Sequence, residues 1–289
     1  MKLFPNDTCW CGSGLKYKKC HMEFDKMLEL KKRQRFKVPG RELIKTPAQI
    51  EAIRESCKCN IEILDYVSEH IAEGITTEEI DRLVVEKTKA LGAIAATLNY
   101  EGYPKSVCTS VNDVVCHGIP SKKQILKSGD IITVDASTIY NGYFSDSARM
   151  FMIGDVKPEV QKLVQVAKES LDVGMKNVIP WNTLGDMSDE INKFVKSNGY
   201  SVVREIGGHG VGLEFHEEPW VSYVEKKGRG MVMAPGMIFT IEPMINMGKA
   251  NVVIDDEDGW TVYTEDGLPS AQWEIMVLVT EKGGEILAY

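Results

Sequence analysis

The segment DIITVDASTIYNGYFSDSARMFMIG, residues 130–154, has the pattern of a β-hairpin. Apolar residues alternate on both sides of Asn141-Gly142, and Asn-Gly between two such runs is the strongest short-range signal for a hairpin turn. If these two residues form the turn, Ser137 faces Asp146 across the two strands. We therefore predict two antiparallel strands joined by a two-residue turn.

Two carboxylates project from one face of this hairpin. Side chains alternate along a strand, so Asp135 shares a face with Ser137 and lies diagonal to Asp146. Two like charges at that spacing raise each other's pKa unless a cation lies between them. Both acids could instead be solvated on an exposed face, but their apolar neighbours argue against this, namely Ile132, Val134, Phe151 and Met152.

A glycine-rich segment further along the chain supplies two histidines. GHGVGLEFHEEP, residues 208–219, contains His209 and His216. We expect the glycines at 207, 208, 210 and 212 to let the backbone approach a ligand closely. The histidines are too far apart for the helical zinc signature H-E-x-x-H. One of them can be a metal ligand while the other faces a substrate, although either alone could be structural.

Two glutamates lie in apolar stretches near the C-terminus. PGMIFTIEPMI, residues 235–245, is typical of a buried strand with Glu242 at its centre. SAQWEIMVLVTE, residues 270–281, repeats this arrangement with Glu274. Either glutamate alone could form a salt bridge in the core. A buried carboxylate is costly unless it is neutralised, however, and a pair of divalent cations would neutralise four carboxylates beside one imidazole. This pattern predicts a two-metal hydrolase.

The composition of the chain is compatible with a globular enzyme. The chain has 289 residues, 43% of them hydrophobic and 26% charged, which is ordinary for a globular enzyme of one large or two smaller domains. It has no apolar run of about 18 residues and no apolar core of a secretion signal near its start. Its seven cysteines therefore predict reduced thiols or metal ligands in the cytoplasm. We expect a monomer with no membrane contact.

Helix signals recur at a fixed spacing. Thr46, Pro47 and Gln49 have the pattern of a helix start, and apolar residues with a helical period continue to about residue 73. We predict further helices at 77–91, 158–175 and 183–198. An offset of 107 superposes four pairs of matching residues: Thr76 on Thr183, Ile80 on Met187, Val84 on Ile191, and Gly92 on Gly199. Two ordinary helices could match by coincidence, but we favour two duplicated α+β halves with a site between them.

These segments, together with NYEGYPKSVCTSVNDVVCHGIP at residues 99–120, resemble the type I methionine aminopeptidases of the pita-bread fold. The resemblance covers residues 45–289. It implies an α+β fold of two pseudo-symmetric halves. It also implies a dinuclear metal site with Asp135, Asp146, His209, Glu242 and Glu274 as ligands, of which Asp146 and Glu274 bridge the ions. A carboxylate-rich set with one imidazole favours Mn, Fe(II) or Co.

The same resemblance implies roles for residues around the metals. Glu242 would relay a proton to the leaving amine, and His117 and His216 would bond the scissile amide. The slot for the methionine side chain would be lined by Tyr100, Tyr103, Cys108, Phe215 and Trp260, whose rings suit a thioether. A monovalent cation would be held at Asn112, Val114 and Ser270. The chain departs from many family members at Ile275 and Thr97, which affects substrate details rather than the ligand set.

A separate motif precedes the body of the chain. Cys9, Cys11, Cys20 and His21 have the spacing C-x-C-x8-C-H, which suits one tetrahedral structural zinc. The motif is similar to the SEC-C motif at the end of the translocation ATPase SecA. The alternative is a set of free thiols in a disordered tail.

Charge also separates this head from the body. Residues 1–45 hold 12 Lys and Arg against 5 Asp and Glu, while the whole chain has a net charge of −8. Lys16, Lys18, Lys19 and the basic run at 31–37 could dock on ribosomal RNA or a protein at the exit tunnel, or could be a solvated linker. We predict a zinc motif at 1–22, a basic helix and linker at 23–45, and a catalytic domain at 46–289.

The functional prediction is therefore removal of the N-terminal methionine from nascent proteins and peptides, with preference for a small second residue. A proline-directed peptidase of the same fold is one alternative, but such enzymes usually have a much larger N-terminal domain. A non-catalytic relative that only binds ribosomes or partners is another. We would expect such a protein to have lost metal ligands, whereas all five are present here.

Overall fold

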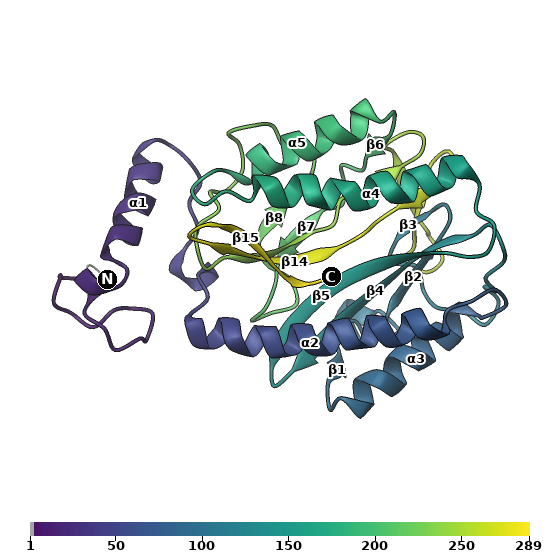
Figure 1. Ribbon diagram of the computed structural model, residues 1–289, viewed down its shortest axis with the longest axis horizontal. Coiled ribbons are helices and arrows are strands. Elements are labelled where there is room, and N and C mark those ends of the chain that lie inside the picture. The colour runs from purple at the N-terminus through teal and green to yellow at the C-terminus, as the bar shows by residue number, and fades with distance from the viewer. Residues whose placement is uncertain (1–2) are drawn as a thin grey trace.

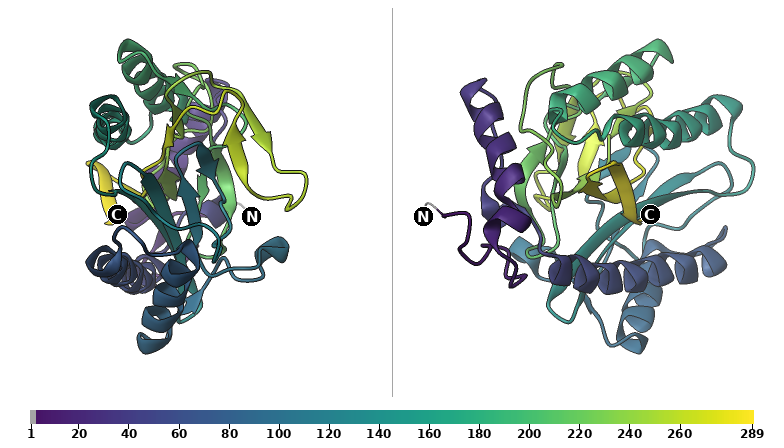
Figure 2. Two further views of the ribbon diagram at one scale, coloured as in Figure 1. Left: turned by 90° about the vertical axis from the view of Figure 1, so that its right-hand side faces the viewer. Right: turned by 60° about the vertical axis from the view of Figure 1, so that its left-hand side comes forward.

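A computed structural model describes residues 3–289 of the chain. Two pairs of helices flank a central layer of strands, and a small N-terminal module lies at one end of the body (Figure 1). The hairpin of β11 (Val252–Ile254) and β12 (Val262–Thr264) projects from the strand layer on the side away from helix α4 (Pro158–Asn177) (Figure 2). This arrangement is the predicted α+β class.

The first helix pair consists of α2 (Pro47–His70) and α3 (Thr77–Ala90). Thr46 caps α2 through a capping box with Gln49, and Thr76 caps α3 in the same way with Glu79. The predicted starts of both helices are therefore confirmed, because the capping side chains satisfy the first free amides as the sequence pattern requires.

The second pair consists of α4 (Pro158–Asn177) and α5 (Leu184–Ser197). Thr183 caps α5 through a capping box with Asp186. The offset of 107 pairs Thr183 with Thr76, which caps α3 in the same way. The paired residues Ile80 and Met187 are both fully buried. The two matched glycines after these helices, Gly92 and Gly199, both have a positive φ (69° and 86°).

Two sheets make up most of the strand layer. The first has the order β1-β4-β2 with β5 paired to β4, and the second has the order β15-β14-β9-β7-β8. The strands of the first sheet are β1 (Ile94–Ala95), β2 (Cys108–Val111), β4 (Ile131–Tyr140) and β5 (Tyr143–Met152). Those of the second are β7 (Gly208–Gly210), β8 (Glu217–Val221), β9 (Ile238–Ile241), β14 (Ile275–Thr280) and β15 (Gly283–Ala288).

Short elements complete the body. Two three-stranded sheets have the orders β13-β10-β6 and β11-β12-β3. Their strands are β3 (Val114–Cys116), β6 (Ser201–Val202), β10 (Ile245–Asn246), β11 (Val252–Ile254), β12 (Val262–Thr264) and β13 (Ser270–Ala271). The 3-10 turns are η1 (Tyr17–Lys19), η2 (Arg41–Leu43) and η3 (Tyr100–Gly102).

An isolated β-bridge joins the two large sheets. Ala148 in β5 and Glu274, just before β14, exchange backbone hydrogen bonds of 3.1 and 3.4 Å. Each half also has its own core. One core packs α2 and α3 against β2 and β4, and the other packs α4 and α5 against β9 and β14. The seam between the halves therefore runs past Glu274, where we expected the site.

The N-terminal module rests on the second half. Its helix α1 (Met22–Arg33) buries Phe24, whose ring lies 5.2 Å from that of Trp181 in the body. Arg41 bonds Asp25 of the helix at 2.6 Å and stacks on Trp10 at 5.2 Å. The linker then pairs with the body, because the backbone amide of Val232 donates to Lys37. Apolar and polar contacts thus both fix the module to the body.

Candidate functional site

The hairpin forms with the predicted register. Asn141-Gly142 is the turn, Ser137 lies opposite Asp146, and Asp135 lies opposite Ala148. Asp135 and Asp146 therefore share a face as a diagonal pair, as predicted. The Ser137 hydroxyl donates to Asp146 at 2.8 Å, which holds this buried carboxylate in one orientation.

Glu242 and Glu274 lie at strand ends rather than strand centres, and this part of the prediction is wrong. Glu242 directly follows β9, and Glu274 directly precedes β14. Ile241 pairs with Ile275 in the antiparallel register of these strands, so the two glutamates are the next residues beyond that pair. Both are buried, and both carboxylates lie where the sheet stops and the cavity begins.

His209 lies in the middle of β7. Its backbone amide donates to Thr240 at 3.0 Å, and its Nδ1 bonds the carbonyl of Gly210 at 2.9 Å. Nε2 is left to face the acids, with Asp146 at 3.5 Å and Glu242 at 3.7 Å.

Two of the glycines around His209 have a packing role that we did not predict. A Cβ at Gly208 would clash with the Tyr223 hydroxyl, and one at Gly210 would clash with the Glu218 carbonyl. Glycine at these positions therefore lets β7 pack tightly against its neighbouring strands. Gly207 lines the cavity, and close approach of the backbone to a ligand stays a prediction.

The five predicted ligand residues line one wall of a single cavity. Donor atoms of Asp146, His209 and Glu274 all lie within 4.8 Å of one another, which is compatible with one shared ion. Asp135 and Glu242 join them on that wall, and the Glu242 carboxylate accepts from Thr240 at 2.6 Å and from Gln272 at 3.1 Å.

The electrostatics of this cluster require a positive charge. Burial, reinforced by the other carboxylates, raises the pKa of Asp135 and of Glu274 well above the usual range. Burial also raises the pKa of Glu242 to about 7, although His209 and Thr240 oppose it. Oε1 of Glu274 is buried without a hydrogen-bond partner. An oxygen-rich donor set with an unpartnered buried oxygen fits hard or intermediate divalent cations.

The cavity has a volume of about 570 Å³ and extends well beyond the acids. All predicted site residues other than the monovalent set and the N-terminal motif contribute to its lining. Gly207, one of the glycines that we expected near a ligand, lines it as well. Several residues that we did not predict also line it: Glu101, Ser137, Ile206, Glu217, Glu218 and Trp220.

Aromatic rings form the apolar end of the cavity. Tyr100 packs edge-on against Phe215 at 4.7 Å, and Tyr103 packs edge-on against Trp260 at 5.2 Å. The Tyr103 hydroxyl is turned away to the carbonyls of Val107 and Gly118, at 3.2 and 2.9 Å. Its ring therefore presents carbon to the cavity. Thr97, one of the two departures noted in the sequence, also lines the cavity.

Two histidines flank the acids. His216 directly precedes β8, and its ring lies 4.1 Å from that of His209. His117 follows β3 with a left-handed backbone (φ 57°) and lies 6.1 Å from the Trp260 ring. Burial lowers the pKa of His117, and burial together with His209 lowers that of His216 to about 4. Both rings are therefore neutral hydrogen-bonding groups at neutral pH.

The proposed monovalent residues lie outside this cavity. Ser270 donates its amide to the Asn112 carbonyl at 2.9 Å, and Val114 begins β3 two residues beyond Asn112. The Asn112 side chain is already engaged with Asp130 and Ile131, at 2.8 and 3.0 Å. The three positions are thus close in the fold, and the cation itself stays a prediction.

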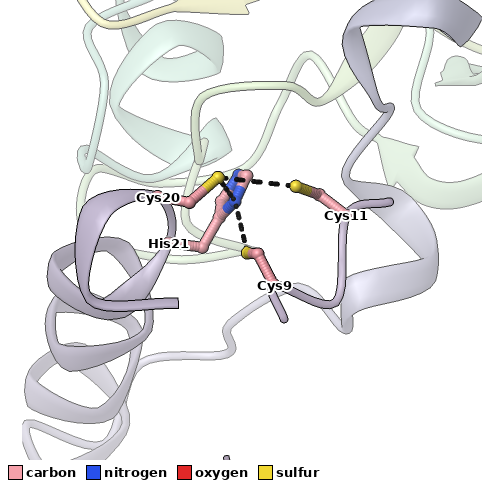
Figure 3. Close-up of side chains that lie close together, drawn as sticks. All are labelled: Cys9, Cys11, Cys20 and His21. Carbon is pink, nitrogen blue, oxygen red and sulfur yellow. Dashed lines mark hydrogen bonds between the residues drawn. The ribbon is translucent and has the colours of Figure 1, made fainter. Parts of the chain in front are cut away.

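The N-terminal motif brings its four ligands together. Cys9, Cys11, Cys20 and His21 point toward one another (Figure 3), with all four donor atoms within 4.8 Å. His21 Nδ1 lies 3.3 Å from the Cys9 sulfur and 3.1 Å from the Cys20 sulfur. None of these cysteines is in a disulfide. Three sulfurs and one imidazole in this arrangement fit a tetrahedral metal site.

Sequence reasoning missed the residues that hold the ligands in place. Tyr223 is fully buried, donates to the Thr240 carbonyl at 3.1 Å and accepts from the Glu242 amide at 2.8 Å. Lys45 forms a buried ion pair with Glu217, directly after His216. A polar residue alternating with apolar ones was the available signal for Thr240, but the partners of Tyr223 and Lys45 are far away in sequence.

The model of metallopeptidase family M24 matches residues 51–281 of the chain, and that of the SEC-C motif matches residues 6–23. The first match spans most of the chain and includes every residue of the acid cluster. The chain belongs to metallopeptidase family M24.

Within this family the chain is a methionine aminopeptidase, as its relatives establish. It is 43% identical to the methionine aminopeptidase of Chlamydia pneumoniae over 98% of this chain and 97% of that protein. It is 42% identical to the methionine aminopeptidase of Escherichia coli over 84% of this chain and 92% of that protein. Membership in this metallopeptidase family implies divalent metal ions.

Solved structures agree on the fold. The methionine aminopeptidase of Rickettsia prowazekii superposes with a TM-score of 0.83 at 39% identity, covering 85% of this chain and 99% of that one. The prolidase of Pyrococcus furiosus has a TM-score of 0.70 at 25% identity, covering 86% of this chain but only 65% of that one. The predicted pita-bread fold is confirmed. The identity is 39% to the aminopeptidase and 25% to the prolidase, which favours the aminopeptidase over the proline-directed alternative.

Within residues 3–289, no helix combines the length and apolar character that a membrane crossing needs.

Proposed function

We propose that this chain removes the N-terminal methionine from nascent proteins and peptides with two divalent cations, Mn, Fe(II) or Co. Asp135, Asp146, His209, Glu242 and Glu274 would hold them, with Asp146 and Glu274 shared between the two. The observation that carries the proposal is the buried acid cluster beside an apolar, aromatic end of one cavity. When bound, such cations polarise a peptide carbonyl and lower the pKa of a water molecule.

The remaining chemistry belongs to the side chains of the protein. Glu242 would relay a proton to the leaving amine. His117 and His216 would orient the scissile amide from the two sides of the acid cluster. Tyr100, Tyr103, Cys108, Phe215 and Trp260 would exclude water from the methionine side chain and contact its sulfur.

The finer specificity rests on the family resemblance. We propose a preference for a small second residue, together with the monovalent cation at Asn112, Val114 and Ser270. Ile275 and Thr97 would adjust substrate details without removing a ligand. We also propose that the protein works as a monomer in the cytoplasm, where nascent chains arise.

Peptide hydrolysis with metal titration tests this proposal. The chelated protein should be inert, and added Mn²⁺ should restore cleavage of Met-Ala-Ser after methionine. Acetyl-Met-Ala-Ser should stay intact, because the free amine is part of what is recognised. Cleavage of the blocked peptide, or full activity of Asp146→Ala, would refute the mechanism.

For the N-terminal region we propose three units: a zinc module at 1–22, a basic helix and linker at 23–45, and the catalytic domain at 46–289. Met1 and Lys2 lie outside the described residues. One zinc would be held by Cys9, Cys11, Cys20 and His21. The exposed Lys16, Lys18 and Lys19 have no carboxylate within 4.0 Å among residues 3–289, so their charge is available to a partner.

We propose that this charge docks the enzyme on the ribosome, through ribosomal RNA or a protein at the exit tunnel. Co-sedimentation with ribosomes tests the proposal. Replacing Lys16, Lys18 and Lys19 by glutamate should abolish co-sedimentation at low salt while peptide cleavage continues. Reversing the exposed Lys122 and Lys123 on the body is the control. Equal binding of both variants would contradict the proposed docking surface.

A further inference from the structure

The cavity lining includes residues that the proposed mechanism does not use. Among them are Ile206, Gly207 and Trp220, none of which belongs to the methionine slot. Because an aminopeptidase leaves most of its substrate outside the slot, the peptide beyond the scissile bond has to leave through an open side of the cavity. An exposed residue in this unused part of the lining is therefore the place to look for contacts with later residues of the substrate.

Trp220 lies opposite a proposed metal ligand. In the register of β7 and β8 its Cα partner is His209 (Figure 1 shows the two strands side by side). Residues directly opposite in an antiparallel pair project from the same face, with Cβ atoms about 4.5–5.5 Å apart. The indole of Trp220 therefore projects from the face that carries the imidazole of His209.

The indole of Trp220 is exposed to solvent and also packs against the backbone at Gly207. Trp220 is 52% exposed, whereas its neighbours Pro219 and Val221 are buried. A Cβ on Gly207 would lie 3.1 Å from Cζ2 of Trp220, so the glycine lets the ring rest on the backbone. A large aromatic surface held open beside a catalytic cavity, instead of being packed into the core, is typical of a ligand contact.

Trp220 lies next to the reacting groups but outside the methionine slot. It is the Cα partner of His209 and lines the same cavity. An extended peptide advances about 3.3 Å for each residue, so the third residue of a substrate lies roughly 5–7 Å beyond the scissile bond. A ring beside a proposed metal ligand and outside the slot is placed to meet a residue beyond the scissile bond, which makes the third residue the candidate for this contact.

We propose that Trp220 forms a binding site for the side chain of the third substrate residue and favours a bulky apolar or aromatic group there. This inference rests on the proposed aminopeptidase function. The ring of Trp220 would cover one face of that side chain, and Ile206 would extend the apolar contact. Peptides that offer only glycine at the third position would lose this contact.

A peptide series tests the site. We would measure kcat/KM for Met-Ala-Phe-Ser and Met-Ala-Gly-Ser with the Mn²⁺-loaded protein. The wild type should prefer phenylalanine about five- to tenfold, as expected for one aromatic contact at a partly open site. Trp220→Ala should reduce the ratio to near one, and Trp220→Phe should retain much of it. Thermal unfolding would verify that both variants fold.

Ile254→Ala is the matched control, because Ile254 is 59% exposed on β11 and does not line the cavity. It should keep the wild-type ratio. A wild type that cuts both peptides equally well, or a Trp220→Ala variant that keeps the preference, would overturn the inference while leaving the aminopeptidase function intact. Failure to cut either peptide would instead refute the proposed function.

Discussion

Lys45 and Glu217 form an ion pair whose side chains are only 1% and 9% exposed. Lys45 ends the linker from the N-terminal module, and Glu217 directly follows His216 at the wall of the cavity. The Glu217 carboxylate also accepts from the amides of Leu213 and Glu214, at 2.7 and 3.2 Å. This one carboxylate thus ties the linker and the loop that carries His216 into a single unit.

Removing the lysine should therefore destabilise the protein. Lys45→Met would leave Glu217 buried and without its cation, and breaking a buried pair in this way costs about 3–5 kcal/mol. Lys37→Met is the matched control, since Lys37 pairs with the adjacent Glu218 but the two side chains are 61% and 59% exposed. That change should cost less than about 1 kcal/mol. Equal losses in urea unfolding would contradict the role of burial.

Removing a carboxylate from the acid cluster should stabilise the metal-free protein and weaken its stabilisation by metal. In chelated protein, Glu274→Gln removes a buried carboxyl whose pKa is raised by burial and by Asp146, so Tm should rise by about 2–4 °C, the shift for ~1 kcal/mol. Adding Mn²⁺ should raise the Tm of the variant by less than it raises the Tm of the wild type, because the variant has lost a proposed ligand. Calorimetry measures both shifts. The exposed Glu281→Gln should change neither, and a lower Tm for chelated Glu274→Gln would show that repulsion is not dominant.

Local signals in the sequence predicted much of the fold. The Asn141-Gly142 turn sets the hairpin register, so the amino-acid pattern alone was enough to place Asp135 and Asp146 on one face. The pattern at Thr46, Pro47 and Gln49 located the start of α2 to the residue, because a cap depends only on its neighbours three positions away. Such features need no knowledge of distant contacts.

The features that could not be predicted from the sequence depend on contacts between segments that are far apart in the chain. The centred positions predicted for Glu242 and Glu274 were wrong because an apolar run does not reveal where hydrogen bonding to a partner strand stops. The packing role of the glycines near His209 was missed for a similar reason, since the atoms that crowd Gly208 and Gly210 come from Tyr223 and Glu218. The five proposed metal ligands were named through resemblance to a family as well as through chemistry.

An ion pair between helix α2 and strand β15 should make part of the protein's stability depend on pH. Arg54 bonds Glu285 at 2.6 and 3.0 Å, and this hydrogen bonding lowers the pKa of Glu285. A carboxyl with a lowered folded-state pKa stabilises the protein above its usual pKa, and that stability is lost as pH falls through the folded value. Water screens the pair, so Glu285→Gln should cost about 0.5–1 kcal/mol at pH 7 and almost nothing near pH 3.

Urea unfolding at several pH values measures this difference. Glu51 also contacts Arg54, at 3.2 Å, but its side chain is 74% exposed, so Glu51→Gln is the control and should have little effect at any pH. A loss for Glu285→Gln that stays constant from pH 7 to pH 3 would mean that packing, not charge, carries the contribution.

The N-terminal cluster should hold zinc independently of the catalytic metals. Cys9→Ser combined with Cys11→Ser removes two of four ligands from a segment too small to fold on its own apolar core, so bound zinc should fall by about one per chain. Cys59→Ser, a cysteine of α2 outside the cluster, is the control and should leave zinc unchanged. Elemental analysis of the purified proteins measures the zinc content.

Mn²⁺-dependent peptide cleavage should persist in both variants, because none of these residues lines the cavity. Unchanged zinc content in the double variant would exclude the cluster as a metal site.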